Sequence, residues 1–377
     1  MKRPLRIGIE VQRLFREKKH GMEIVALEIL KELQQLDTYN QYIVFAKKDK
    51  DLQCLQETPN FKIELVAGSF YPIWEQFELP KAVKKHNLDF LHSTCNTSVL
   101  KLPVPLMLTL HDIIYLENVN FKGTAYQNFG NLYRRFIVPA VVKKSKVVIT
   151  VSNFEKEVIK NRLNVPEEKI KVIYNAVNRK FNNNYPAKDI IRFKQKYELP
   201  NEFILFLGNT SPKKNTYNVI LAFAEYCRSA SNITPLVVLD YDKSLVEAIL
   251  EKIGQSGLIA HFIFPGFITS DTMPLIYNAA TLFLYPSLRE SFGLPILEAM
   301  GCNTPVITST TSCMPEIAAD AAYLVDPFSV DEITNGIKVL LGNKVMRGEL
   351  SSKGLKRAAE FSWRSAAEKL LTLYNEF

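Results

Sequence analysis

Two glutamates with seven residues between them stand in the stretch 285–301, YPSLRESFGLPILEAMG. A strand is expected to end where this stretch begins, and a helix to begin at Pro295, because proline is favoured at the first helical position. Glu290 precedes that helix and Glu298 lies one turn inside it. Gly293 lets the backbone approach a ligand closely, and a helix N-terminus offers free N–H groups and a positive dipole end. The stretch predicts a diphosphate site between two carboxylates; a loop with two solvated glutamates is the alternative.

His111 and Asp112 follow an expected strand over residues 106–110. Ligands of open parallel sheets bind beyond the carboxyl ends of the strands, so both side chains are expected at a ligand-binding edge. A lone histidine is more often structural. Its T-L-H-D setting and its position at a strand end nevertheless favour a functional role.

A second candidate phosphate contact follows the apolar run 203–207, FILFL. This run ends at Gly208 and continues through Asn209 to Lys213 and Lys214. Two lysine ammonium groups near a strand end would offset the negative charge of a diphosphate. A solvated helix start is the alternative.

The sequence gives little support for a metal site. Asp240-Tyr241-Asp242 has a D-x-D spacing that can hold a divalent cation, but it follows the strand-like run LVVL, and we interpret it as a turn and helix start. The five cysteines are scattered, without a C-x-x-C pair, which argues against structural zinc and favours a reducing compartment. We expect neither a metal nor a cofactor.

Strands and helices are expected to alternate along the chain, which predicts parallel sheets covered on both faces. The pattern restarts after the Asn-rich polar stretch 178–189, interpreted as a linker. We therefore predict an α/β protein with two Rossmann-like domains, residues 1–180 and 181–361, facing across a cleft. A last amphipathic helix, residues 362–377, is expected to cross back to the first domain.

Several segments together resemble glycosyltransferase family 4, whose members have the GT-B fold. The glutamate pair in its P-S-x-x-E-S-F-G-L-P-x-L-E-A-M-G setting resembles the EX7E signature of that family. The resemblance covers most of the chain and is nearest to the mannosyl- and rhamnosyltransferases of bacterial surface-polysaccharide assembly. Further matching segments, in the order of the family, are Gly21–Glu23 (the acceptor loop), 109–112 (TLHD), 150–154 (TVSNF), 175–178 (NAVN) and 208–215 (GNTSPKKN).

The resemblance implies a role for each matching residue. Glu290 would contact the donor sugar, Glu298 the ribose, and His111 the donor sugar, while Asp112 would orient His111 or the acceptor. Gly21, Met22 and Glu23 would contact the acceptor. The nucleotide, the diphosphate and the sugar of the donor would further contact Gly208, Asn209, Lys213, Lys214, Gly266, Phe267, Ser291, Phe292, Gly293 and Leu294.

One departure from the family concerns the charges on the diphosphate. Many relatives carry arginine at the position of Asn209 or Lys213, and lysine lacks the bidentate fork of arginine. The sequence leaves open whether Lys213 or only Lys214 supplies the positive charge.

The activity that the resemblance implies is metal-independent hexosyl transfer with retained anomeric configuration. The donor would be a nucleotide sugar, GDP-mannose first and a UDP-hexose second, and the acceptor a glycan or lipid-linked oligosaccharide. A nucleotide-sugar 2-epimerase and a catalytically silent nucleotide-sugar-binding protein are the alternatives. A Rossmann oxidoreductase has no support, because G-x-G-x-x-G does not occur.

The net charge of +8 arises in the first 180 residues, which hold 29 Lys and Arg against 19 Asp and Glu. A basic half favours an anionic membrane surface or a phosphorylated substrate, or is simply solvated; no nucleic-acid module is present. Tyr126, Phe129 and Tyr133, beside Arg134 and Arg135, form either a membrane-interface face or part of a core. Lacking a long apolar run or a signal peptide, the chain is expected in the cytoplasm, with peripheral contact at the inner membrane face as a further expectation.

Overall fold

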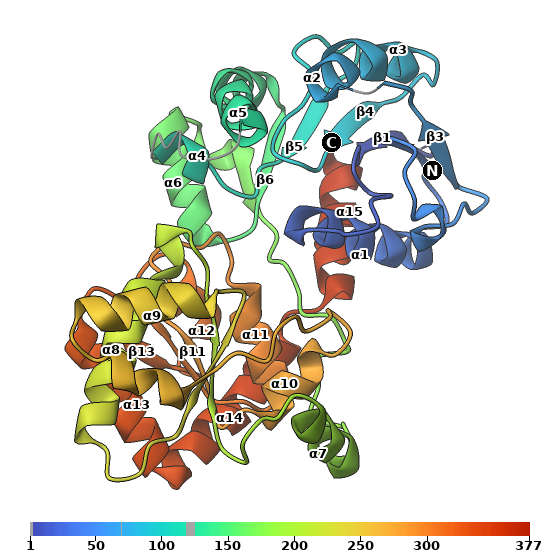
Figure 1. The fold of residues 1–377 in the computed structure, drawn as a ribbon. Helices are drawn as coiled ribbons and strands as arrows, with labels where there is room; N and C mark the ends of the chain where they lie inside the picture. The colour runs from blue at the N-terminus through green and yellow to red at the C-terminus, as the bar shows by residue number, and fades with distance from the viewer. Residues whose placement is uncertain (1–2, 69, 118–124) are drawn as a thin grey trace. The chain divides into compact units, whose positions relative to one another are not determined.

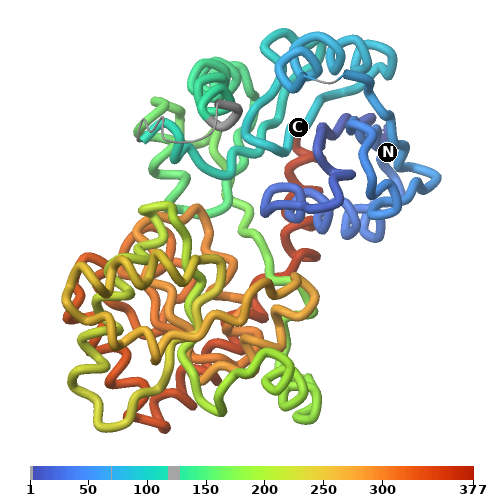
Figure 2. The backbone as a smooth tube through the Cα atoms, in the orientation of Figure 1, coloured from blue at the N-terminus to red at the C-terminus, as the bar shows by residue number. Residues whose placement is uncertain are grey.

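The computed structural model of the chain describes residues 3–68, 70–117 and 125–377. The chain divides into two compact units, traced in Figures 1 and 2. Unit 1 comprises Met1–Asn175 together with Trp363–Phe377, and unit 2 comprises Ala176–Ser362. Each unit is described by itself below.

Unit 1 is built on a sheet of parallel strands. Among the described residues the strand order is β3-β2-β1-β4-β5-β6-β7. The order reverses between β1 and β4, which makes the carboxyl edge between these two strands the expected place for a ligand. The strands are β1 (Arg6–Glu10), β2 (Gln41–Ala46), β3 (Phe61–Leu65), β4 (Phe90–Ser93), β5 (Leu106–Thr109), β6 (Val147–Thr150) and β7 (Ile170–Val172).

Two apolar clusters cover the two faces of this sheet. One contains Phe45, Leu108 and Val141, and the other contains Leu30 of α1 and Tyr374 of α15. The helices of unit 1 are α1 (Gly21–Leu36), α2 (Tyr71–Ile73), the π-helix η2 (Trp74–Glu78), α3 (Leu79–Lys84), α4 (Ile114–Glu117), α5 (Ala125–Lys144), α6 (Asn153–Leu163) and α15 (Trp363–Glu376), with 3-10 turns η1 (Leu52–Cys54) and η3 (Glu167–Lys169).

Helix α15 packs beside α1, and Figure 1 shows the two helices together within unit 1. Its apolar side chains Ala367, Leu370 and Tyr374 are almost completely buried in the cluster that contains the α1 leucines. This burial of one apolar stripe explains why a C-terminal amphipathic helix returns to the first domain, as predicted.

Unit 2 is built on a second parallel sheet. Among its residues the strand order is β10-β9-β8-β11-β12-β13, with the reversal between β8 and β11. The strands are β8 (Ile204–Leu207), β9 (Leu236–Leu239), β10 (Phe262–Ile263), β11 (Leu282–Tyr285), β12 (Val306–Ser309) and β13 (Tyr323–Val325).

Helices cover the second sheet, and the apolar side chains of its strands are buried beneath them in a core (Figure 1). They are α7 (Ala187–Lys196), α8 (Thr216–Ser229), α9 (Lys243–Lys252), α10 (Met273–Ala279), α11 (Leu294–Gly301), α12 (Met314–Ala318), α13 (Val330–Gly342) and α14 (Lys344–Ala359), with 3-10 turns η4 (Pro212–Lys214) and η5 (Ser256–His261).

The polar stretch 178–189 belongs to unit 2 and packs against its other residues. The Lys180 ammonium donates to the Ser270 hydroxyl at 2.9 Å, and the Asn278 amide donates to the carbonyl of Asn182 at 2.9 Å. A Cβ added at Gly301 of α11 would lie 2.6 Å from the carbonyl oxygen of Phe181. The first half of the stretch expected to be a linker is therefore packed and hydrogen-bonded.

Within the described parts of the chain, no helix combines the length and the apolar composition needed to cross a membrane.

Candidate functional site

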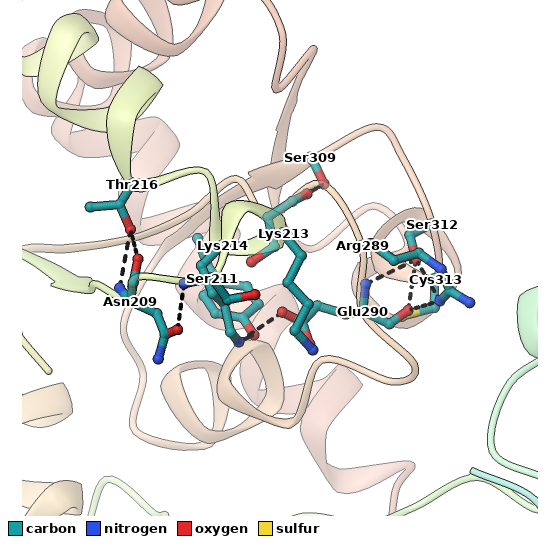
Figure 3. A network of polar contacts seen from close by, with 12 residues as sticks. Asn209, Ser211, Lys213, Lys214, Thr216, Arg289, Glu290, Ser309, Ser312 and Cys313 are labelled. Carbon is teal, nitrogen blue, oxygen red and sulfur yellow. Dashed lines mark hydrogen bonds and ion pairs between the residues drawn. The ribbon is translucent and has the colours of Figure 1, made fainter. Parts of the chain in front are cut away.

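Glu290 lies in the loop between β11 and α11, and both its backbone N–H and its carbonyl are hydrogen-bonded to Ser312 or Cys313 (Figure 3). The Glu290 N–H donates to the hydroxyl oxygen of Ser312 at 3.1 Å. The Glu290 carbonyl accepts from the same hydroxyl at 2.6 Å and from the thiol of Cys313 at 3.2 Å. These bonds fix the backbone from which the carboxylate projects.

The Glu290 carboxylate faces two lysines (Figure 3). The Lys214 ammonium lies 2.7 Å from Oε1, and the Lys213 ammonium lies 3.9 Å from Oε2. The Glu290 side chain is 11% exposed, and its Oε1 is the atom paired with the Lys214 ammonium. Burying a carboxylate is costly unless it is compensated, so the Lys214 charge is its main compensation.

Lys214 is in turn positioned by an aromatic side chain. Its ammonium donates to the hydroxyl of Tyr285 at 2.8 Å and lies 4.9 Å from the centre of that ring. Tyr285 ends strand β11 and is 1% exposed, so the contact ties the lysine to the rigid sheet.

The loop after β8 is closed by its own polar groups. The Thr216 hydroxyl accepts from the Asn209 N–H at 3.1 Å and donates to the Asn209 carbonyl at 2.8 Å (Figure 3). A Cβ added at Gly208 would lie 2.5 Å from the Cβ of Tyr241, so only glycine fits there without displacement. The predicted residues Gly208 and Asn209 thus shape the loop that carries the lysines.

This loop is attached to the loop that carries Glu290. The Asn215 amide donates to the carbonyls of Pro286 at 3.0 Å and of Pro327 at 2.7 Å. The N–H of Leu288 donates to the carbonyl of Lys213 at 2.7 Å. These bonds join the loop that carries the lysines to the loop that carries Glu290.

Helix α11 begins one residue earlier than predicted, at Leu294, with Pro295 in second place. Gly293 precedes it with a φ of 82°, in the left-handed region that favours glycine, and as the N-cap residue it has no side chain to cap the helix. Ser291 and Phe292 complete the turn between Glu290 and the helix. The backbone N–H groups of this turn are the predicted diphosphate contacts.

Glu298 lies in α11, where its Oε2 accepts from the hydroxyl of Tyr277 at 3.1 Å. Burial raises the pKa of Glu298 to about 7, although the Tyr277 hydroxyl and the Lys180 charge oppose the shift. Near neutral pH the carboxyl is therefore present in both protonation states. A carboxyl of this kind can accept from or donate to the hydroxyls of a ribose.

Other predicted positions of unit 2 lie beyond its remaining strand ends. Gly266 follows β10 with a φ of 79°, and the side chain of Phe267 is 75% exposed. Asp242 immediately precedes α9 and its carbonyl accepts from the Leu245 N–H at 3.1 Å, which makes the D-x-D segment a turn and helix start. The described residues contain no group of three or more His, Cys, Asp or Glu side chains arranged to hold a metal.

His111 in unit 1 is buried beyond the end of β5 and is 6% exposed. Its backbone N–H donates to the Asn96 side-chain oxygen at 2.6 Å, and its ring nitrogen Nε2 lies 2.9 Å from the carbonyl oxygen of Thr94. The carbonyl contact assigns the proton to Nε2 and leaves Nδ1 as the acceptor nitrogen. Burial lowers the pKa of His111, so the ring is held neutral.

The predicted acceptor loop meets Asp112 within unit 1. Met22, Glu23 and Asp112 all line a pocket of about 210 Å³, and Gly21 begins α1 at its side. Glu23 Oε2 accepts from the His20 N–H at 2.9 Å, and the Asp112 carboxylate accepts from the Ile114 N–H at 3.1 Å. His111 lines a different, smaller cavity of unit 1 with His92.

Four side chains of these sites were not predicted. Tyr285 and Ser312 position Lys214 and Glu290, and His92 is hydrogen-bonded to Tyr374 and Thr109 beside the cavity of His111. None of these three has a local sequence signal, because its partner is remote in sequence. The fourth side chain, Glu10, does have a sequence signal, since it is a carboxylate within the apolar run LRIGIEV.

Solved structures share this two-sheet architecture over the whole chain. Anabaena HepE, determined in complex with UDP and glucose, has a TM-score of 0.74 at 20% identity and covers 99% of this chain and 100% of its own. WaaG, a glycosyltransferase involved in lipopolysaccharide biosynthesis, has a TM-score of 0.71 at 17% identity, covering 97% and 98%. The fold is therefore that of the GT-B glycosyltransferases, as predicted.

Sequence comparison then identifies the family. The model described as Glycosyltransferase Family 4 matches residues 20–181, and the model described as Glycosyl transferases group 1 matches residues 187–357. The chain belongs to glycosyltransferase family 4, which confirms the resemblance found in its motifs.

Similar curated proteins are named as mannosyltransferases. O-antigen chain mannosyltransferase B of Escherichia coli is 30% identical over 234 residues, which are 61% of this chain and 60% of that protein. Serotype-specific mannosyltransferase WbdA of Escherichia coli is 30% identical over 268 residues, 70% of this chain and 32% of that protein. The chain thus matches about three fifths of the first relative's length and a third of the second's.

Proposed function

We propose that the chain is a retaining hexosyltransferase. It moves a hexose, mannose in the first place, from a nucleotide sugar to a glycan or lipid-linked oligosaccharide in the synthesis of a cell-surface polysaccharide. The observation that carries this proposal is the contact of Lys214 with Glu290 beside the uncapped start of α11. It combines a positive charge for a leaving diphosphate with a carboxylate for the transferred sugar.

The donor half of the reaction is assigned to unit 2. A departing nucleoside diphosphate gains negative charge in the transition state, so fixed positive groups lower the barrier. Lys214 and the N–H groups at Gly293 and Leu294 supply this stabilisation without a metal. Glu290 contacts the sugar hydroxyls, and Glu298 holds the ribose.

The preferred donor is GDP-mannose, and a UDP-hexose is the second candidate. The first choice follows the names of the relatives, which are mannosyltransferases. The second follows HepE, whose structures were determined with UDP and with UDP-glucose. Gly266 and the exposed Phe267 are proposed to border the nucleobase.

The other half of the reaction involves residues of unit 1. The neutral His111 ring contacts the donor sugar, and Asp112, Gly21, Met22 and Glu23 contact the acceptor. The acceptor hydroxyl attacks on the face from which the diphosphate departs, and the leaving phosphate takes its proton. This route retains the anomeric configuration and needs no protein nucleophile.

Peripheral contact with an anionic membrane is a further part of the proposal. Phe129, Leu132 and Phe136 on α5 are 43%, 45% and 72% exposed, and they belong to the basic part of the chain. Tyr133 of the same helix instead accepts from the Gln76 amide at 2.8 Å, so the predicted aromatic face is divided. The side chain of Tyr126 lies outside the described residues.

A thermal-shift screen of nucleoside diphosphates and their sugars tests the proposal. A ligand at 100 times its Kd should add about 2.7 kcal/mol to the free energy of unfolding. If no nucleotide sugar raises the melting temperature, the transferase assignment is wrong. Donor consumption in the absence of any acceptor would favour the 2-epimerase alternative, and stabilisation without turnover would favour the silent binder.

A further inference from the structure

The pocket of unit 1 that contains Met22, Glu23 and Asp112 has a chemistry of its own. It lies beyond the carboxyl ends of β1 and β4, the two strands at which the order of the sheet reverses. Glu10, the last residue of β1, lines it together with Cys95 and Asn96, which follow β4. Its volume of about 210 Å³ is space for a small ligand at the place where parallel sheets bind one.

Glu10 is a buried carboxyl at the carboxyl end of β1. It is 2% exposed, and its Oε1 accepts from the Gln12 N–H at 2.9 Å. Burial, together with the charge of Glu75, raises the pKa of Glu10 to about 8, although the Arg13 charge opposes the shift. At pH 7 this carboxyl is mostly protonated, so it can both donate to and accept from ligand hydroxyls.

The opposite wall of the pocket is aromatic and held in place. Tyr71 and Tyr133 donate from their hydroxyls to Glu75, which is 1% exposed, and their rings meet edge to face at 5.7 Å. Phe70 and Phe129 lie 5.5 Å apart at its rim. Aromatic faces of this kind pack against the C–H face of a sugar ring, and the fixed hydroxyls prevent the wall from collapsing.

The charged side chains that line the pocket balance one another. Glu23 and Asp112 line the same space as Glu10. Arg13 and Arg134 line the pocket as well, with the Arg13 guanidinium 5.1 Å from the centre of the Tyr71 ring and that of Arg134 5.6 Å from the centre of the Tyr115 ring. Two carboxylates and two guanidinium groups leave no excess of positive charge for a phosphate, whereas a neutral sugar would find hydrogen-bonding partners.

We propose that this pocket binds the uncharged terminal sugar of the acceptor, with Glu10 bonded to its hydroxyls and the rings of Tyr71 and Phe129 packed on its apolar face. This inference rests on the proposed function and adds the substrate class of its second site. Glu10 becomes a specificity-determining residue, because a buried neutral carboxyl group both donates to and accepts from sugar hydroxyls.

The test uses the full chain without any donor and measures the Kd of methyl glycosides of mannose, glucose, galactose and N-acetylglucosamine by ligand-observed NMR. Phe129→Ala and Glu10→Gln should each weaken the best of these about tenfold. Phe136→Ala is the matched control, because Phe136 lies on the same helix, is 72% exposed and does not line the pocket.

Three results would overturn the inference: no methyl glycoside binds, both phenylalanine variants behave alike, or inorganic pyrophosphate displaces the glycoside. The thermal-shift screen with nucleotide sugars separates this failure from failure of the proposed function. If nucleotide sugars bind and glycosides do not, only the assignment of this pocket is wrong. If nucleotide sugars fail to bind, the transferase proposal is wrong, whatever the glycosides do.

Discussion

Glu290 in unit 2 and Glu10 in unit 1 are both buried glutamates beyond or at a strand end, and their surroundings differ. Glu290 has the Lys214 ammonium at 2.7 Å, whereas Glu10 has a backbone N–H and the repulsion of Glu75. Desolvation disfavours the charge of a buried carboxylate, and the Lys214 ammonium offsets this cost at Glu290. The same residue type therefore serves as an ion-paired carboxylate in one unit and as a mostly neutral carboxyl in the other.

This difference matches what each unit is proposed to bind. A ligand that carries a diphosphate brings its own charge, and it can take over Lys214 when it binds beside Glu290. An uncharged sugar brings only hydroxyls, and a neutral carboxyl with aromatic neighbours suits it. Unit 2 is thus proposed to recognise the charge of the diphosphate, and unit 1 the hydroxyl groups of the sugar.

Glu290→Gln should have the largest effect, because it removes the charge that supports the reacting sugar while preserving size. We expect transfer to fall about 100-fold or more. Binding of free nucleoside diphosphate should remain, since Lys214 is still present. Initial rates and calorimetric binding of the diphosphate check both statements. Glu349→Gln on the exposed face of α14 is the control, and loss of diphosphate binding in Glu290→Gln would show that its role is misassigned.

Lys214→Met compared with Lys213→Met separates the two lysines. Losing a charged contact costs about 1.5–3 kcal/mol, so Lys214→Met should weaken diphosphate binding about 10- to 100-fold. Lys213→Met should cost only a few-fold, because its ammonium is 3.9 Å from Glu290 and its side chain is 36% exposed. Calorimetry with the nucleoside diphosphate measures both. Equal losses would mean that the two lysines share the diphosphate.

Glu10→Gln should change how stability depends on pH. The pKa of Glu10 is about 8 in the folded chain and 4.5 in the reference state, so between these values the unfolded chain has lost a proton that the folded chain keeps. Stability must then fall as pH rises through this window, by at most about 1.4 kcal/mol per pH unit. Urea unfolding at pH 5, 6, 7 and 8 should show a shallower fall for Glu10→Gln than for the natural sequence. Parallel curves would contradict the assignment.

Much of the fold could be predicted from the sequence because its signals are local. Apolar runs such as FILFL and LVVL became β8 and β9, and a restart of the pattern predicted the second sheet. Strand β13 was missed, since Tyr323–Val325 is a short run without a clear boundary. The first part of stretch 178–189 was taken for a linker because its partners, among them Ser270 and Gly301, are remote in sequence.

The sequence predicted which residues belong to the candidate sites better than it predicted which of them are in contact. The spacing of Glu290 and Glu298 placed both near one helix start, as the structure has them. The spacing did not predict that Glu290 would pair with Lys214, because that contact joins two loops through long-range folding. Glu10 was missed for a different reason: an apolar run with one carboxylate is equally typical of an edge position exposed to water.

Helix α15 has a consequence for how the protein is made. Residues 363–377 leave the ribosome after all of unit 2, yet they supply Leu370 and Tyr374 to the core of unit 1. The first unit to be synthesised is therefore the last to be completed, and its α1 face stays uncovered while unit 2 folds. A fragment that ends at Asn175 would expose this apolar surface and aggregate, whereas one that joins residues 363–377 to it through a short linker would restore the missing helix.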